Sequence, residues 1–300
     1  MPRRNFLLVL AYDGTDFSGW QRLPGKARSV QAEVEAALGR ALGRALGRAQ
    51  GLPQGLPPGR PADTGSATGA GGAAASAAAP SAPGLAPAFA TPASAAFAPI
   101  EVVGAGRTDA GVHAEGQAAS FHAHTALSPE ELAEALRREL PGDIACLSCR
   151  EVDPRFHARY RAKTKVYRYR LHVAAKPDPE ARRRSLHVGE PLDLAAMAEA
   201  ARLLVGERDF RAFTNAKGTA DSKRRLLRAE VLRNGDFVDL VFEGYGFLYN
   251  QVRLMSAALL EVGLRRMTPA RLAAVLSGGD RASAPGALGA FGLSLVEVRY

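Results

Sequence analysis

The sequence predicts an α+β fold with a largely antiparallel sheet. Along its 300 residues, short apolar or alternating runs typical of strands alternate with segments of helical periodicity, without a βαβ phosphate fingerprint. Asn234-Gly235 stands between two alternating runs, which is the strongest short-range signal for an antiparallel hairpin. Apolar residues make up 47% of the chain and charged residues 23%, close to ordinary globular usage. A chain of this length can form one large domain or two smaller ones.

The first fifty residues predict a strand, a turn-rich segment and a helix. Residues 6–12 (FLLVLAY) are an apolar run typical of a buried strand, and the turn-rich DGTDFSGWQR follows them. Ser29 is the expected N-cap of a helix that runs into three tandem copies of ALGR at residues 37–48. Residues 51–99 then consist mainly of Ala, Gly, Pro, Ser and Thr, which cannot bury enough apolar surface to fold. We expect this segment to be a disordered insertion.

Ordered structure is predicted to resume at Ile100. Ser128-Pro129-Glu130-Glu131 is expected to start a helix, because proline suits the first helical position and acidic residues are favourable in the first turn. The other predicted elements are a strand, loop and strand over 100–124, strands at 141–152 and 164–173, a helix at 193–204, the hairpin at 231–244, a long helix at 247–264 and a final strand at 293–300.

The charge is concentrated in the second half of the chain. The formal charge is +9 and the pI about 9.9. Residues 1–150 carry 13 basic and 13 acidic side chains, whereas residues 151–300 carry 26 basic and 17 acidic ones. A basic half can be an ordinary solvated surface, or it can be a face that binds the phosphates of a polyanion.

Cysteine content and hydropathy argue against several classes. Cys146 and Cys149 are the only cysteines, so there is no disulfide framework, and no second Cys or His pair completes a zinc site. Arg3-Arg4 precedes an apolar run as in a twin-arginine export signal, but the run ends at Tyr12 without a small-residue cleavage site. No apolar run reaches the roughly 18 residues of a membrane span. We therefore expect a cytoplasmic protein without a metal site.

The segment GAGRTDAGVHAEG, residues 104–116, is the first candidate for chemistry. Its glycines permit positive φ angles or close backbone approach to a ligand. Asp109 follows Arg107 by two residues, and a nearby arginine would keep its carboxylate ionised. An ionised aspartate suits a nucleophile or a base. The same aspartate could equally cap its own backbone in a tight turn, and the local pattern leaves both interpretations open.

A second candidate is RFHARYRAKTKVYRYRL, residues 155–171. Basic charge interleaved with aromatic rings suits single-stranded or flipped nucleotides, which need phosphate neutralisation and a stacking surface. Tyr167 and Tyr169 would share one face of a strand, and Arg168 and Arg170 the other. The alternative is a solvated basic strand with core tyrosines, which we expect for Tyr169. The basic residues, unaccompanied by any acid, are Arg155, Arg159, Arg161, Lys163, Lys165, Arg168 and Arg170.

Arg253 is the third candidate. It lies in GFLYNQVRLMSAALLEVG, which predicts a strongly apolar helix. An arginine in the middle of such a helix either extends to solvent or pairs with a buried carboxylate.

Seven blocks of the chain together resemble the bacterial tRNA pseudouridine synthase A family. They occur in the order expected of that family and cover the chain outside residues 51–99, which depart from its pattern. The blocks are YDGTDFSGWQR, SVQAEVEAAL, GAGRTDAGVHAEGQAASF, LPGDIA, FHARYRAKTKVYRYR, GERDFRAFT and GFLYNQVRLMSAALLEVG.

The resemblance implies an isomerase that converts uridine to pseudouridine at positions 38, 39 and 40 of the tRNA anticodon stem-loop. It implies the pseudouridine synthase fold, in which two subdomains, here residues 1–157 and 158–300, share one sheet with a basic cleft between them. A homodimer with tRNA across both subunits is expected, and no cofactor or metal.

Four residues of this chain match the functional positions of the family. Asp109 would be the essential aspartate, and Arg253 would form an ion pair with it. Tyr167 would pack against the target base. Arg107 would contact tRNA and help to hold the flipped nucleotide.

Overall fold

The computed structural model describes residues 3–23, 25, 28–49, 100–216, 218 and 221–300. The insertion expected at 51–99 therefore lies outside the described residues. The elements up to residue 161 are β1 (Arg3–Tyr12), α1 (Val30–Ala49), β2 (Val103–Gly104), β3 (His113–His124), α2 (Pro129–Glu139), β4 (Ile144–Val152) and α3 (Ala158–Arg161). The later elements are β5 (Thr164–Val173), β6 (Leu186–Val188), α4 (Leu194–Leu204), β7 (Gly206–Asp209), β8 (Lys223–Asn234), β9 (Phe237–Gly244), α5 (Gln251–Gly263), α6 (Pro269–Gly278) and β10 (Leu293–Arg299).

Among the described residues, the strands form one 10-stranded sheet. Its order is β4-β1-β3-β10-β5-β9-β8-β7, with β2 added to β3 and β6 to β5. Most neighbours are antiparallel, whereas β10 is parallel to β3 and β6 is parallel to β5. The predicted α+β fold with a mostly antiparallel mixed sheet is confirmed.

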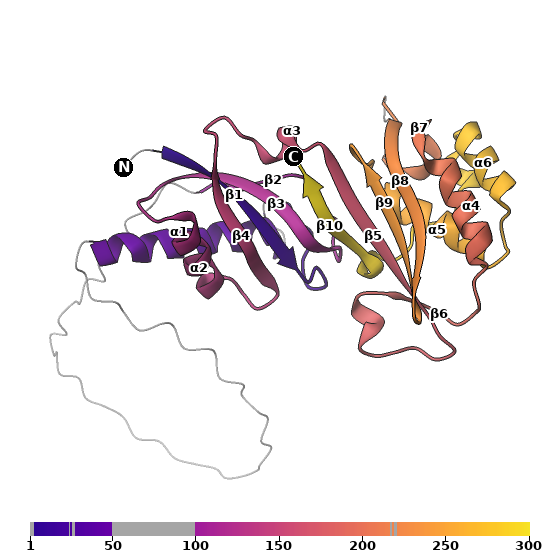
Figure 1. Ribbon diagram of the computed structural model, residues 1–300, viewed down its shortest axis with the longest axis horizontal. Coiled ribbons are helices and arrows are strands. Elements are labelled where there is room, and N and C mark those ends of the chain that lie inside the picture. Colours follow the sequence, from indigo (N-terminus) through magenta and orange to yellow (C-terminus); the bar gives the residue numbers. More distant parts are fainter. Residues whose placement is uncertain (1–2, 24, 26–27, 50–99, 217, 219–220) are drawn as a thin grey trace, which may run out of the picture.

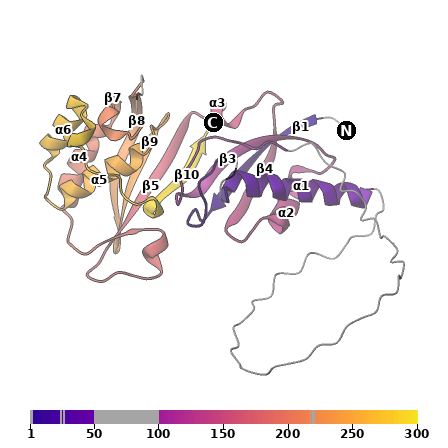
Figure 2. The same ribbon diagram turned by 180° about the vertical axis from the view of Figure 1, so that it is seen from behind.

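The last strand, β10, joins the two parts of the sheet. It lies between β3 and β5, so strands from the first and second halves of the chain share one ladder. Figures 1 and 2 show α1 and α2 beside β1, β3 and β4, and α4, α5 and α6 beside β5, β8 and β9. The C-terminus ends near α3, where the Tyr300 hydroxyl donates to the Ala158 carbonyl at 3.0 Å.

Local sequence signals account for several element ends. The Ser128 hydroxyl accepts from the Glu131 N–H at 3.1 Å, and the Glu131 carboxylate accepts from the Ser128 N–H at 2.8 Å, which completes a capping box at α2. The predicted hairpin is present as β8 and β9, but Asn234 pairs with Phe237, so the two loop residues are Gly235 and Asp236. Gly235 has φ 60°, the conformation that a type II′ turn requires at its first central position.

The long helix predicted from residue 247 begins later than expected. Asn250 has φ 61°, and α5 starts at Gln251. Asparagine is one of the few residues that tolerate this left-handed conformation, and it separates Phe247 from the helix. Arg253 therefore lies in the first turn of α5, and the expectation of a mid-helix arginine is wrong. Among the described helices, none is long and apolar enough to cross a membrane.

Candidate active site

The loop between β2 and β3, residues 105–112, carries Asp109 and is held by the turn-rich segment after β1. The Thr108 carbonyl accepts from the Trp20 N–H at 3.0 Å, and the Thr108 hydroxyl is hydrogen-bonded to the Tyr12 hydroxyl at 2.8 Å. The Gly111 N–H donates to the Phe17 carbonyl at 3.3 Å. DGTDFSGWQR thus supports the loop from behind, a role that its turn-like composition did not reveal.

Two glycines of the 104–116 motif are needed for different physical reasons. A Cβ on Gly104 would lie 2.5 Å from the Trp20 ring, so this glycine allows the indole to pack under the loop. Gly111 has φ 77°, a conformation that side chains other than glycine rarely adopt. Gly104 therefore makes room for Trp20 at the end of β2, and Gly111 shapes the loop itself.

Asp109 and Arg253 come together although 144 positions separate them in the sequence. An Asp109 carboxylate oxygen lies 4.0 Å from Nη1 of Arg253, and the Asp109 side chain is 35% exposed. Burial raises the pKa of Asp109, and the positive charge of Arg253 opposes that rise. Within the described residues, no backbone N–H donates to this carboxylate, so the turn-cap interpretation finds no support.

The orientation of Arg253 is fixed by two acceptors other than Asp109. Its Nε donates to the Leu288 carbonyl at 2.6 Å, and its Nη1 donates to the Asn250 side-chain oxygen at 3.0 Å. The guanidinium is thus held beside Asp109 without a direct hydrogen bond to it. This leaves the carboxylate oxygens of Asp109 open to the pocket.

Tyr167 stands next to this pair on β5. Its side chain is 8% exposed, and its ring meets the Phe247 ring edge-on, with centroids 5.1 Å apart. Burial raises the pKa of Tyr167, and Tyr12 and Asp109 add to the rise, so the phenol is neutral at physiological pH. Tyr169 is fully buried and donates to the Gly289 carbonyl at 2.9 Å, as expected for a core tyrosine.

One pocket of about 840 Å³ brings all four predicted site residues together: Asp109, Arg107, Tyr167 and Arg253. Arg107 is exposed and, among the described residues, forms no hydrogen bond or ion pair. Further residues line the pocket. His157, Arg159, Tyr160 and Lys165 belong to the basic, aromatic stretch at 155–171, whereas Trp20 and Phe247 were not expected to act at the site. Lys165 was discoverable, because it precedes Tyr167 by two positions on one strand and so shares its face.

The basic stretch at 155–171 divides into two groups. Arg168 forms an ion pair with Glu115, and Arg170 forms a bidentate pair with Asp239 at 2.7 and 2.8 Å. Carboxylates on other strands therefore balance the charges of these two arginines, and neither arginine needs a phosphate partner. Lys165 and Arg159 face the pocket instead.

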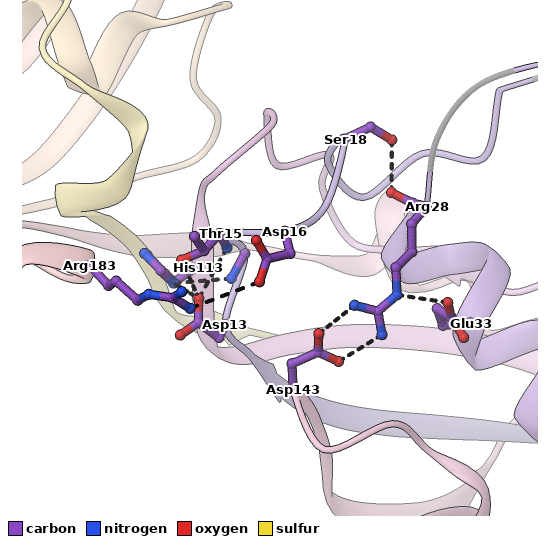
Figure 3. Close-up of polar contacts among 10 residues, drawn as sticks. Asp13, Thr15, Asp16, Ser18, Arg28, Glu33, His113, Asp143 and Arg183 are labelled. Carbon is purple, nitrogen blue, oxygen red and sulfur yellow. Dashed lines mark hydrogen bonds and ion pairs between the residues drawn. The ribbon is translucent and has the colours of Figure 1, made fainter. Parts of the chain in front are cut away.

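Arg28 strengthens the segment that supports the Asp109 loop (Figure 3). Its Nη2 donates to Asp143 and its Nε to Glu33, both at 2.9 Å. The guanidinium carbon also lies 4.3 Å from the centre of the Phe17 ring, a cation–π geometry. Since the Phe17 carbonyl receives the Gly111 N–H, this cluster is connected to the loop.

His113 fixes the start of β3, just after the loop. The Gly14 N–H donates to its Nδ1 at 3.1 Å, so the proton lies on Nε2, which donates to the Phe291 carbonyl at 3.0 Å. Burial lowers the pKa of His113, which keeps the ring neutral, with Asp13 3.3 Å from its Nδ1 (Figure 3). The neutral imidazole thus connects the segment after β1 with the segment before β10.

No group of three or more His, Cys, Asp or Glu side chains that could hold a metal ion occurs among the described residues. The pocket is lined by two carboxylates, Asp109 and Glu101, together with several cations and aromatic rings. Such a set can bind an anionic, ring-containing ligand and present it with an ionisable carboxylate.

Comparisons with known proteins identify the family of this chain. A family model described as tRNA pseudouridine synthase matches residues 8–161 and 200–300. A tRNA pseudouridine synthase A of Geobacillus kaustophilus is 35% identical over 97% of this chain and 93% of its own length. One of Bacillus sp. (strain KSM-64) is 32% identical over 99% of both chains, and one of Moorella thermoacetica is 44% identical over 67% of this chain and 82% of its own. The chain therefore belongs to the tRNA pseudouridine synthase family, whose members are isomerases.

Proposed function

We propose that this enzyme isomerises uridine to pseudouridine at positions 38, 39 and 40 of the tRNA anticodon stem-loop, with Asp109 as the essential carboxylate. The observation that carries the proposal is the meeting of Asp109, Arg253 and Tyr167 in one pocket. These residues lie far apart in the sequence, and nothing in the packing of the core requires a half-exposed carboxylate there.

The reaction needs an ionised carboxylate and an extruded base. The glycosidic bond from N1 of uracil to C1′ breaks, the uracil rotates, and a bond from C5 to C1′ forms; C5 loses its proton and N1 gains one, so that the product is an isomer of the substrate. Asp109 can act as a nucleophile toward the sugar or base, or it can remove a ribose proton to give a glycal. Both routes use the same ionised form, which Arg253 favours against the effect of burial. Extruding the base costs a few kcal/mol of stacking, which contacts in the pocket must offset.

The remaining residues fit the same proposal. Tyr167 would pack against the extruded uracil, and the exposed Arg107 would bind the tRNA and help to hold the flipped nucleotide. The substrate and product are isomers, so the reaction balances without a cofactor. We also propose a homodimer that binds tRNA across both subunits in the cytoplasm.

The division into subdomains 1–157 and 158–300 also enters the proposal. Asp109 and Arg107 come from the first part, and Tyr167 and Arg253 from the second. A basic cleft between the two parts would then place the target uridine where they meet.

Incubation of the purified protein with unmodified tRNA, followed by pseudouridine mapping, tests reaction and position together. We expect pseudouridine at positions 38 to 40 with the natural chain. Asp109→Ala should give none, while binding tRNA within several-fold of the natural chain. A non-catalytic RNA-binding protein would give no pseudouridine with either form, and pseudouridine only in another RNA would refute the proposed substrate.

A further inference from the structure

We propose that the pocket contains a second nucleotide subsite, formed by His157, Tyr160, Arg159 and Lys165, which holds a nucleotide adjacent to the target uridine. The proposal rests on the proposed function, because it assigns the neighbour of the base that Asp109 acts on. The subsite has two parts, an aromatic platform for a base and a pair of cations for a phosphate.

The platform is the ring of Tyr160. This side chain is 79% exposed, yet its ring is stacked on the His157 ring with centroids 4.2 Å apart and planes at 26°. His157 is itself fixed as the N-cap of α3, because its Nδ1 accepts from the N–H groups of Arg159 and Tyr160 at 3.2 and 3.3 Å. One face of the tyrosine is thus supported, and the ring is exposed as part of the pocket lining. RNA-binding proteins use such rings to stack unpaired bases.

The cations are Lys165 and Arg159. Lys165 is half-buried and packs on the Asp109 loop, since a Cβ on Gly106 would lie 3.1 Å from its Cε. Among the described residues, neither cation forms an ion pair with a carboxylate, in contrast to Arg168 and Arg170 nearby. Burial and the charge of Arg159 both lower the pKa of Lys165. Two like charges that line one pocket, neither of them in an ion pair with a carboxylate of the described residues, favour an anion beside them, and a phosphate fits.

The position of Lys165 connects this subsite to the target base. Lys165 and Tyr167 are two residues apart on β5 and so point to the same face of the sheet. The Lys165 side chain also lies beside Gly106, where an added Cβ would be 3.1 Å from its Cε, three residues before Asp109. The pocket volume of about 840 Å³ lies near the upper end of the range for small-molecule sites, about 300–1,000 Å³, and exceeds what one uracil needs. Tyr160 is among the residues that line this pocket.

Binding of anticodon stem-loops to Tyr160 variants tests the platform. All forms carry Asp109→Ala, so that the RNA stays unmodified during the titration. We expect Tyr160→Ala to weaken binding about tenfold and Tyr160→Phe, which keeps the ring, to bind like the parent. The same titrations use stem-loops with an abasic nucleotide on the 5′ or the 3′ side of the target. At one of these sides the difference between Tyr160→Ala and the parent should vanish. An equal loss on all three RNAs would overturn the platform.

The salt dependence of the same binding tests the phosphate contact. Lys165→Met should reduce the slope of log K against log salt by about 0.7–0.9, and Lys165→Arg should keep it. Arg233→Gln is the charge control, because it also removes one positive charge. Arg233 lies at the hairpin end of β8, where β9 pairs with the His172 end of β5 and not with the Lys165 end. If Lys165→Met and Arg233→Gln change the slope equally, the phosphate contact is refuted. These titrations measure binding and involve no turnover. If the natural chain formed no pseudouridine, that result would refute the proposed function, and the binding results could still be interpreted.

Discussion

Replacing Asp109 with asparagine removes the negative charge from the pocket and keeps the shape of the side chain. In the folded protein, burial raises the pKa of Asp109 and Arg253 only partly opposes this. The ionised carboxylate is therefore less stable in the fold than in the unfolded chain. We predict that Asp109→Asn abolishes pseudouridine formation and at the same time slightly raises the stability of the fold at neutral pH.

The structure limits the size of this gain. A unit-charge pair at 4 Å is worth about 1 kcal/mol in water and about 4 kcal/mol at an effective dielectric constant of 20, and the Asp109–Arg253 separation is 4.0 Å. The raised pKa shows that burial outweighs this attraction. Because the side chain is 35% exposed, solvent screens both terms, and the net gain is at most about 1 kcal/mol. For a chain of this size, that is a rise in Tm of about 2 °C.

The pH dependence of the stability gives a second test of whether Asp109→Asn stabilises or destabilises the fold. A carboxyl whose pKa is raised in the fold binds its proton more tightly in the folded state, so the natural chain gains stability as pH falls toward that pKa. The advantage of Asp109→Asn should thus be largest at pH 7, shrink as pH falls and disappear below about pH 3, where both states of the natural chain are protonated. Calorimetry of both forms across this range, with pseudouridine assays at pH 7, measures the two effects. A lower Tm for the variant at pH 7 would refute the reasoning, because it would show a carboxylate that stabilises its own loop.

Two further predictions concern packing. Tyr167→Phe should keep most of the isomerisation rate, whereas Tyr167→Leu should lower it about 5- to 150-fold, the effect of losing 1–3 kcal/mol of base stacking; equal rates in single-turnover assays would contradict a stacking role. Gly104→Ala should destabilise the fold by about 1–3 kcal/mol in urea unfolding, because its Cβ would lie 2.5 Å from the Trp20 ring. Gly39→Ala is the matched control, since nothing lies within 4 Å of that Cβ on α1, and it should stabilise by about 1 kcal/mol. If both substitutions change the free energy of unfolding in the same direction, the close approach of Gly104 to the Trp20 ring does not determine the effect of Gly104→Ala.

The elements that local chemistry determines were predictable from the sequence. Residues 164–173 alternate and form β5 as predicted, and the helix predicted to start at Ser128-Pro129 is α2, which begins at Pro129. The hairpin followed from Asn234-Gly235, although its loop residues are shifted by one. The central place of β10 was not predictable, because its partners β3 and β5 lie more than a hundred residues earlier. Long-range pairing of this kind leaves no periodic signal in the strand itself.

The residues of the candidate site likewise divide into those that were predictable from the sequence and those that were not. Asp109, Tyr167 and Arg253 were found through the motifs that contain them, and the structure places them in one pocket. The contribution of Trp20 was missed, because its role is to fill the space under a loop 84 residues later. Tyr160 and Lys165 were noted only as members of a basic, aromatic stretch. Their separation from Arg168 and Arg170 depends on Glu115 and Asp239, which belong to other strands.

Arg253 shows why the rest required the structure. A cation in the first turn of a helix opposes the helix dipole, at a typical cost of about 0.3–1 kcal/mol, and the first turn of α5 contains no acidic residue to compensate. Local preference would place a carboxylate there. Arg253 is held in this position by the Leu288 carbonyl, the Asn250 side chain and the facing Asp109, two of which are distant in sequence. A residue that violates its local rule and is oriented by remote partners is expected at a functional site, and this arginine stands beside the one carboxylate to which we assign the chemistry.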